Sequence, residues 1–450
     1  MNTITMKLLK SVTLVAGALA VGGPALALDY NGYFRGLAGS NSSKGGPTCF
    51  QMTGTLAKYR LGNECQVYGE FWMGQEVAKT DDGASFSGNI MFYFNNANVS
   101  SEVDTVGLSQ VYAQGDKIPE FNGASLWAGR KYYKREALGP NDFFYWNGQG
   151  FGGGMEDMRV GDNLKFSYAW LRRDKLIATT TGGGGSRAAI GAPAVGALAE
   201  NGSNSASRHD FQLRGIPTNP NGSLELGLSY IAKDAKGSDD YPERMLHSGY
   251  GVTVQHRQTG ILGDGWNKLA LQYGVGPGTG GNDAGIGSIG NLTDSKDIRR
   301  YRVVEGAYAQ FTPRLGAELV AIYQKDTGYT AAQTVIGRAE NKVWTSLGGH
   351  LVYGFTQHIK LGADLGFDTV KPENGATRRM TKLTIAPTIS SGPRLSARPD
   401  LRLFYTYAKW NDAAREAADF ANAGSALSST GAFGRATSGS MVGIQVEAWF

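Results

Sequence analysis

The chain has 450 residues, of which 65 are glycine and 11% are aromatic, and its formal net charge is +5. So small a charge is no nucleic-acid signature, and two cysteines cannot make a disulfide-rich scaffold. The length would suggest two or three globular domains, but no shift in composition and no linker divides the chain. Glycine for turns and aromatic residues for strands favour a single large β architecture.

Residues 1–27 have the features of a secretory signal peptide. Lys7 and Lys10 precede an apolar stretch, Val12–Val21, which is too short to be a membrane anchor. Ala25–Ala27 is an A-x-A cleavage site. The mature chain is therefore predicted to begin at Leu28 and to leave the cytoplasm.

The two cysteines, Cys49 and Cys65, lie close together in the sequence. Because the mature chain is predicted to reach a compartment where disulfides form, their even number and short spacing predict one disulfide that pins a loop. Two free structural thiols are the alternative.

Residues 28–450 show period-two alternation in many places, whereas helical periodicity is scarce. At the C-terminus, apolar residues take one parity and mostly polar residues take the other: Val442, Ile444, Val446, Ala448 and Phe450 against Met441, Gly443, Gln445, Glu447 and Trp449. Similar alternation occurs in residues 66–73, 266–273 and 402–407. Strands between lipid and a water-filled lumen are expected to alternate in this way.

A closed transmembrane β-barrel accounts best for these strands. No segment of the mature chain holds 18 uninterrupted apolar residues, so helical spans are excluded, and a barrel is the other structure that satisfies every backbone group in lipid. A soluble β-sandwich or a secreted β-helix remains the alternative. Glycine-rich segments at 179–208, 274–296 and 411–440 are predicted as long surface loops, and strands of about 10 residues would give roughly 16 to 18 strands.

Several blocks of the sequence resemble one known family, the maltoporins or LamB-type carbohydrate porins. The blocks are GYFRG (32–36), CFQMTGTLAKYRLGNECQVYGEFWMGQEV (49–77), WAGRKYY (127–133), DFFYW (142–146), GWNKLALQY (265–273), ARPDLRLFYTYAKW (397–410) and the ending VEAWF. They span the whole mature chain, while the loops between them diverge.

The resemblance implies an all-β fold in which residues 28–450 form one transmembrane antiparallel β-barrel of 18 strands, assembled as a homotrimer. It implies passive diffusion of maltose or maltodextrin-like sugars across the outer membrane of a Gram-negative bacterium. The implied partners are oligosaccharide solutes, outer-membrane lipid and lipopolysaccharide, and further copies of the chain, with no nucleic acid, cofactor or metal. In this family the paired cysteines lie in the first loop, and the third loop folds inward and narrows the pore.

A sugar path needs inward aromatic rings with charged side chains on the same face. A pyranose stacks its apolar face on a ring, charged groups hydrogen-bond its hydroxyls, and a row of weak sites lets it enter and leave. By the resemblance, the aromatic slide contains Tyr33, Tyr68, Trp266 and Trp449, and the polar track contains Arg35, Arg60, Glu70, Arg135 and Asp142. As alternatives, Trp449 could belong to an interfacial girdle, Tyr68 and Glu70 could be a cross-strand pair, and Arg60 and Arg135 could serve loop salt bridges.

The resemblance places the constriction loop at Lys134–Gly154, with Phe144 where the family usually has a tyrosine. The chain also departs from the family pattern by Ala137 and Asn147 for aspartates, Ser109 for an arginine, Ser396 for a slide aromatic, and a second loop without Trp. Fewer aromatics predict relaxed or shifted sugar choice, and the retained arginines predict a mild anion preference. A general non-specific or mildly anion-selective porin is the alternative function.

Nothing in the sequence indicates an enzyme. It contains no G-x-S-x-G, H-E-x-x-H or C-x-x-C motif, and its five histidines are scattered. An adhesin or phage receptor is a further alternative that long loops would allow, but the retained lumen residues favour transport.

Overall fold

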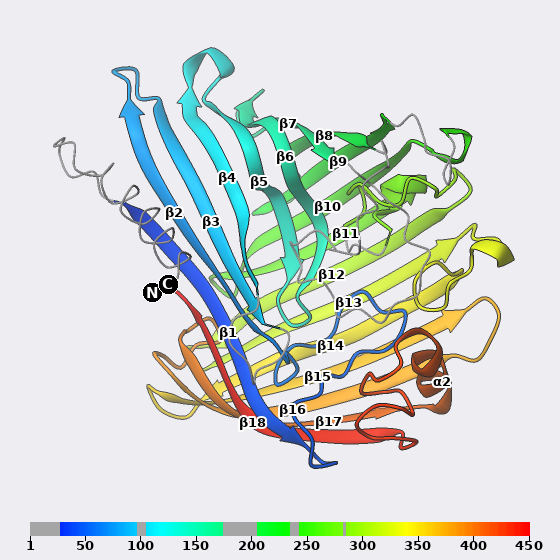
Figure 1. Cartoon of the computed structure of the whole chain (residues 1–450). Helices are drawn as coiled ribbons and strands as arrows, with labels where there is room; N and C mark the ends of the chain where they lie inside the picture. The colour runs from blue at the N-terminus through cyan, green and yellow to red at the C-terminus, as the bar shows by residue number, and fades with distance from the viewer. Residues whose placement is uncertain (1–27, 97–104, 174–204, 235–242, 282–284) are drawn as a thin grey trace, which may run out of the picture.

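The computed structural model describes residues 28–96, 105–173, 205–234, 243–281 and 285–450. The predicted signal peptide, 1–27, and most of the predicted loop 179–208 lie outside these residues. Within the described ranges, eighteen strands form one sheet that closes on itself (Figure 1).

The strands are long, and helices are few and short. In chain order the elements are β1 (Asp29–Asn41), β2 (Val67–Lys79), β3 (Ser85–Asn96), β4 (Thr105–Ile118), η1 (Pro119–Phe121), β5 (Ala124–Leu138), β6 (Phe143–Arg159), β7 (Lys165–Arg173), β8 (Ala206–Pro217), β9 (Gly222–Lys233), η2 (Glu243–Met245), β10 (Gly249–Ile261), β11 (Gly265–Val275), η3 (Gly276–Thr279), β12 (Arg299–Thr312), β13 (Leu315–Thr327), η4 (Ala331–Gln333), β14 (Lys342–Gly354), β15 (Ile359–Pro372), β16 (Arg378–Ser390), β17 (Asp400–Trp410), α2 (Asp412–Ala421) and β18 (Ser438–Trp449). No helix among these residues is long and apolar enough to cross a membrane.

Each strand pairs antiparallel with its neighbours in sequence, and β18 pairs with β1 to close the ring. At this closure Tyr33 lies opposite Trp449, and the backbone N–H of Gly32 donates to the carbonyl oxygen of Phe450 at 2.8 Å. A closed sheet has no edge strand, so its backbone groups are satisfied within the barrel. The predicted closed antiparallel barrel is confirmed, at eighteen strands among the described residues.

The alternation read from the sequence sorts side chains between the two faces of the wall. On β18, Val442 and Ile444 are 57% and 59% exposed, whereas Gln445 and Glu447 are each 3% exposed. On β17 the same holds for three outward residues, Leu403, Tyr405 and Tyr407, which are exposed, and three inward ones, Arg402, Phe404 and Thr406, which are buried. An apolar outer face and a polar inner face suit a wall between lipid and water.

The two rims of the barrel differ in the length of their connections. Residues 80–84, 262–264 and 313–314 are short turns at the rim that carries the start of β1 and the end of β18. At the other rim, residues 42–66 and 411–437 are long connections, and the second of them contains α2 (Figure 1).

The connection 42–66 lies against the inner face of the barrel. A disulfide joins Cys49 to Cys65, with Cα atoms 5.7 Å apart, as predicted from their number and spacing. The hydroxyl of Tyr59 shares a 3.0 Å hydrogen bond with the hydroxyl of Ser346 on β14. The connection therefore crosses to a part of the wall, at β14, that is not adjacent to the strands it joins, as the blue trace in Figure 1 shows.

Glycine lets this connection approach the wall closely. Gly62 has a φ of 56°, and a Cβ there would stand 2.6 Å from the hydroxyl oxygen of Thr406. That hydroxyl donates to the carbonyl oxygen of Gly62 at 3.0 Å. A larger residue would be strained in its backbone and would separate the connection from β17.

The segment expected to be a loop at 134–154 is mostly strand. β5 continues to Leu138 and β6 begins at Phe143, so only residues 139–142 connect them. The end of this hairpin contacts distant strands: the ring of Phe143 lies edge-on to Trp344 of β14, and the hydroxyl of Tyr145 donates to Gln255 of β10 at 2.6 Å. The segment is strand rather than loop because β5 and β6 remain hydrogen-bonded to each other beyond the barrel wall.

Candidate functional site

Aromatic rings from three adjacent strands lie side by side inside the barrel. The ring of Tyr33 on β1 is 6.2 Å from that of Trp449 on β18, at an interplanar angle of 27°, and 6.4 Å from that of Tyr68 on β2. The guanidinium of Arg35 lies over the Tyr68 ring at 5.2 Å, and that of Arg398 lies over the Trp449 ring at 4.1 Å. Three of the four predicted slide residues thus form one row with cations on its faces.

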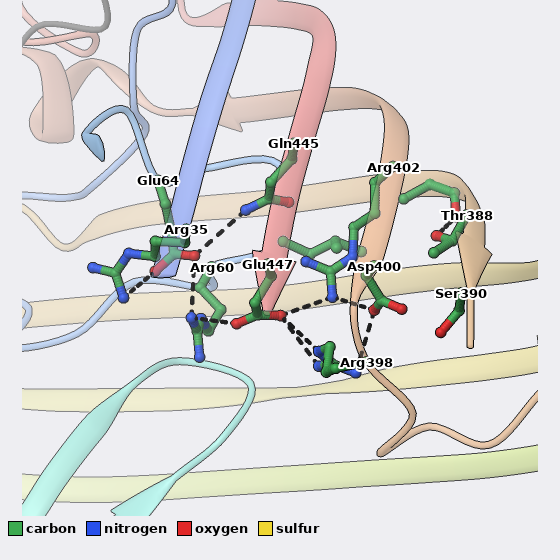
Figure 2. Close-up of polar contacts among 12 residues, drawn as sticks. Arg35, Arg60, Glu64, Thr388, Ser390, Arg398, Asp400, Arg402, Gln445 and Glu447 are labelled. Atoms are coloured by element: carbon green, nitrogen blue, oxygen red, sulfur yellow. Dashed lines mark hydrogen bonds and ion pairs between the residues drawn. The ribbon is translucent and has the colours of Figure 1, made fainter. Parts of the chain in front are cut away.

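Three arginines converge on the carboxylate of Glu447 (Figure 2). Arg60 from the disulfide-closed connection donates to Oε1 at 2.7 Å, and Arg402 on β17 donates to Oε2 at 2.8 Å. A nitrogen of Arg398, from the connection between β16 and β17, lies 3.1 Å from the same Oε2. These side chains come from segments far apart in sequence, and their mutual hydrogen bonds hold all of them in place.

Glu64 ties the first connection to β1. Its carboxylate forms ion pairs with Arg35 at 2.9 Å and with Arg60 at 3.2 Å, while Asp142 lies 3.5 Å from Arg35. Burial works to lower the pKa of Arg60, but the carboxylates of Glu64 and Glu447 outweigh it and hold that pKa well above its ordinary value. Arg35 and Arg60 are therefore charged and fully matched by acids.

A cavity of about 360 Å³ opens beside this network. The aromatic residues Trp266, Tyr308 and Trp449 line it, together with Arg60 and Glu447. Trp266 and Tyr308 are direct cross-strand partners whose rings stack 6.4 Å apart at 29°. The cavity thus has apolar ring faces on its walls and charged groups between them. These groups complement a pyranose, whose apolar face stacks on rings and whose hydroxyls form hydrogen bonds with charged groups.

A second group of predicted residues lies on the β5–β6 hairpin. The guanidinium of Arg135 is sandwiched between the rings of Tyr132, at 4.0 Å, and Phe144, at 4.2 Å. Glu70 accepts hydrogen bonds from the hydroxyls of Tyr132, at 3.0 Å, and Tyr68, at 2.5 Å. This group therefore joins the aromatic row through Tyr68.

The structure brings the predicted residues together in two connected sets. Trp266, Trp449 and Arg60 line the cavity, and Tyr33 touches it through the Trp449 ring. The other predicted residues adjoin this set through Tyr68 or Arg35, namely Glu70, Arg135, Asp142 and Phe144. Whether each contacts a solute is a proposal.

The lumen residues that were not identified from the sequence include Tyr132, Tyr308, Glu318, Asp364 and Arg398. Tyr308 could have been found, because β12 alternates and Tyr308 shares the parity of inward Arg302 and Val304, which are both 1% exposed. Nothing in the sequence places Arg398 over Trp449. Ser396, where the family pattern has an aromatic, does line the cavity.

Among the residues that the structure describes, no group of three or more His, Cys, Asp or Glu side chains is arranged to hold a metal ion. The groups available for binding at this site are aromatic rings, paired charges and hydroxyls. Such groups bind polyhydroxylated solutes reversibly without making or breaking bonds.

A family model described as LamB porin matches residues 28–450. Among solved structures, Pseudomonas aeruginosa OpdQ is 10% identical with a TM-score of 0.48, covering 94% of this chain and 98% of that one. Pseudomonas aeruginosa OccK10 (OpdN) is 11% identical with a TM-score of 0.48, covering 94% and 99%. A mutant of Rh. blastica porin is 11% identical with a TM-score of 0.40, covering 94% and 100%.

The structural likenesses are too distant to add to the strand order that the barrel itself displays. The family match is different in kind, because it covers every described strand. An apolar outer face and a polar bore suit a channel-type protein of the Gram-negative outer membrane. The chain therefore belongs to the LamB porin family and is an outer-membrane porin.

Proposed function

We propose that this porin conducts carbohydrates of the maltose and maltodextrin kind by passive diffusion. The observation that carries the proposal is the continuous run of ring faces from Tyr68 through Tyr33 and Trp449 to the cavity that Trp266 lines. Ion-paired arginines flank this run. Rings offer weak stacking at each step, and charged groups exchange hydrogen bonds with hydroxyls, so a sugar can move between similar sites.

We further propose that the hairpin end at residues 139–142 and the connection 42–66 together narrow the bore. The backbone N–H of Arg60 donates to the carbonyl oxygen of Pro140 at 3.0 Å, which supports a joint constriction. Phe144 and Arg135 would border the passage. Assembly as a homotrimer and removal of residues 1–27 as a signal peptide belong to the same proposal.

The test is sugar-dependent blockade of current through single channels in planar bilayers. Maltotriose should block the wild-type channel, and Trp266→Ala and Trp449→Ala should each weaken the block by about tenfold, taking roughly 1–3 kcal/mol per stacked nucleobase as an upper bound. The matched control is Tyr405→Ala, which removes an aromatic ring from the outward face. A wild-type current that no sugar interrupts would instead identify a non-specific porin.

The departures from the family pattern support a shifted sugar choice. Ser396 lines the cavity without a ring face, so long oligosaccharides lose one stacking site there. Liposome swelling with maltose, maltotriose, sucrose and glucuronate would rank the solutes. The anion preference expected from Arg35, Arg60 and Arg135 stays a prediction: Glu64, Asp142 and Glu447 match the first two arginines, whereas Arg135 lies between the rings of Tyr132 and Phe144.

A further inference from the structure

Five side chains that line the cavity form one row around the inner wall. Cross-strand pairing sets Trp266 beside Tyr308, Tyr308 beside Glu318, Glu318 beside His350, and His350 beside Asp364. Directly paired residues have Cβ atoms about 5 Å apart. A ring platform on β11 and β12 is thus continued by the carboxylate of Glu318 on β13, the imidazole of His350 on β14 and the carboxylate of Asp364 on β15.

The charges around this cavity are unevenly matched. Its three arginines, Arg60, Arg398 and Arg402, all have acidic partners within 3.2 Å. Among the described residues, by contrast, Glu318 makes no hydrogen bond or ion pair within the protein. The carboxylate of Glu318 therefore remains free for a solute, next to the ring of Tyr308.

Asp364 supplies a second, independent acceptor. Its side chain is 1% exposed, and Oδ1 has no hydrogen-bond partner in the described part of the chain. Its other oxygen, Oδ2, accepts from the backbone N–H of Leu61 at 3.3 Å and lies 3.9 Å from Nζ of Lys382. A buried, unpaired acceptor is costly unless a ligand or water satisfies it.

The hairpin end closes the cavity over Glu318. Gly139 lies so near that a Cβ on it would stand 2.9 Å from Oε1 of Glu318. The volume of about 360 Å³ is at the small end of the range for ligand pockets. A sugar ring in contact with the Trp266 and Tyr308 rings would therefore have its polar edge directed at the Glu318 carboxylate.

We propose that the cavity is a subsite for sugars that carry a protonated amine, with Glu318 as the residue that selects them. This inference rests on the proposed carbohydrate function. The ring faces bind the sugar, and Glu318 pairs with the ammonium group, with Asp364 beyond His350 in the same row. Neutral sugars stack in the same place without the ionic contact, and uronates are disfavoured there by the unpaired carboxylate.

The experiment compares the full-length channel with two variants in planar bilayers at neutral pH, where sugar amines still carry protons and a carboxyl group is more readily ionised than in acid. Affinities come from current blockade by three probes: glucosamine trimer, its N-acetylated counterpart and maltotriose. Glu318→Gln keeps an acceptor of the same shape but removes the charge. The matched control is Asp368→Asn, which changes a buried carboxylate on β15 outside the cavity. Asp368 accepts a hydrogen bond from Nε1 of Trp344 at 3.1 Å, and the oxygen of an asparagine can accept the same bond.

The wild-type channel should bind the glucosamine trimer about fivefold more tightly than the N-acetylated trimer. Glu318→Gln should reduce that ratio to near one while leaving maltotriose within about twofold, and Asp368→Asn should keep the wild-type ratio. An equal affinity of wild-type protein for both trimers, or an unchanged ratio in Glu318→Gln, overturns the inference even if maltotriose blocks normally. If no sugar blocks the wild-type channel, the proposed function fails as well.

If Glu318→Gln does not assemble, the wild-type channel still tests the inference, through its affinities for the glucosamine trimer and the N-acetylated trimer. Raising the salt concentration gives a further measurement on that protein, because screening weakens an ionic contact but not stacking. The preference for the amine should then decline with salt, and a preference that salt leaves untouched would contradict a role for the carboxylate.

Discussion

The backbone N–H of Arg60 and the carbonyl oxygen of Pro140 are joined by a 3.0 Å hydrogen bond. Arg60 lies in the connection closed by the disulfide, and Pro140 lies at the end of the β5–β6 hairpin. Two connections that leave the wall at the same rim thus support each other. The width of the passage should depend on both.

Removing the disulfide tests this dependence. In the double variant Cys49→Ser, Cys65→Ser, the connection loses a cross-link that, for a loop of about 15 residues, contributes about 3 kcal/mol on the chain-entropy model. We expect a barrel that still forms, with larger and noisier single-channel conductance. Reductant should change the wild-type conductance in the same direction and leave the double variant unaffected. An unchanged conductance in the variant would show that Arg60 and Pro140 hold their places without the disulfide.

Charge selectivity should depend on Glu447. Glu447→Gln removes the carboxylate on which Arg60, Arg398 and Arg402 converge, so the bore gains uncompensated positive charge. The permeability ratio of chloride to potassium, obtained from reversal potentials in a salt gradient, should rise by at least about twofold. Glu416→Gln, on the exposed side of α2, is the control and should not alter it. A Glu447→Gln channel with wild-type reversal potentials would mean that the network does not face the ion path.

The outward face should tolerate charge only near the rims. Leu271 lies in the middle of β11 and is 52% exposed, so Leu271→Arg should cost about 2–4 kcal/mol of folding free energy in lipid. Leu262→Arg, in the short turn 262–264, should cost about 0–1 kcal/mol. Unfolding in vesicles by denaturant, followed by tryptophan fluorescence, measures both. Equal costs at the two positions would contradict the placement of β11 across the hydrocarbon core.

The connection 276–298 should open more readily as pH rises. Burial raises the pKa of Asp294 to about 7, although Arg300 and the amide of Asn291 work to lower it. A carboxyl with a raised folded-state pKa stabilises the connection fully at low pH, and this stabilisation is lost as the pH rises through about 7. We therefore expect trypsin to cleave after exposed Lys296 faster at alkaline than at acidic pH, by up to about tenfold after correction for the protease's own pH profile.

Two variants complete this measurement. Asp294→Asn stays neutral at every pH, so its cleavage rate should lose the dependence on pH that remains after the correction. Asp297→Asn, at an exposed position three residues further on, should behave as the wild type does. A pH dependence that survives in Asp294→Asn would assign it to another group.

Much of the barrel wall could be predicted from the sequence, because the direction of a strand side chain depends only on its parity. Leu403 and Tyr405 alternate with Arg402 and Phe404 in the sequence, and the structure places them on opposite faces. The same reasoning would have found Tyr308. The disulfide could be predicted equally well, since Cys49 and Cys65 have no other cysteine to pair with.

The inside of the barrel could not be predicted in this way. The sequence predicted a loop near 134–154, but β5 and β6 stay paired through most of this segment, almost to the end of the hairpin. It also could not show that Glu447 pairs with Arg60, which lies in a connection 387 residues earlier in the chain. Such encounters depend on strand register and on the path of a connection, and neither is encoded in local periodicity.

The sequence by itself determined the two faces of the alternating strands and the covalent link in the first connection, because each follows from residues that are near one another in the chain. Only the tertiary structure decided which charges cancel, that Glu318 is left unpaired beside Tyr308, and that Arg60 meets Pro140. The reason is that closing the sheet brings side chains from opposite walls and inward connections to within hydrogen-bond distance. Their separation in space is set by the register of the whole ring of strands.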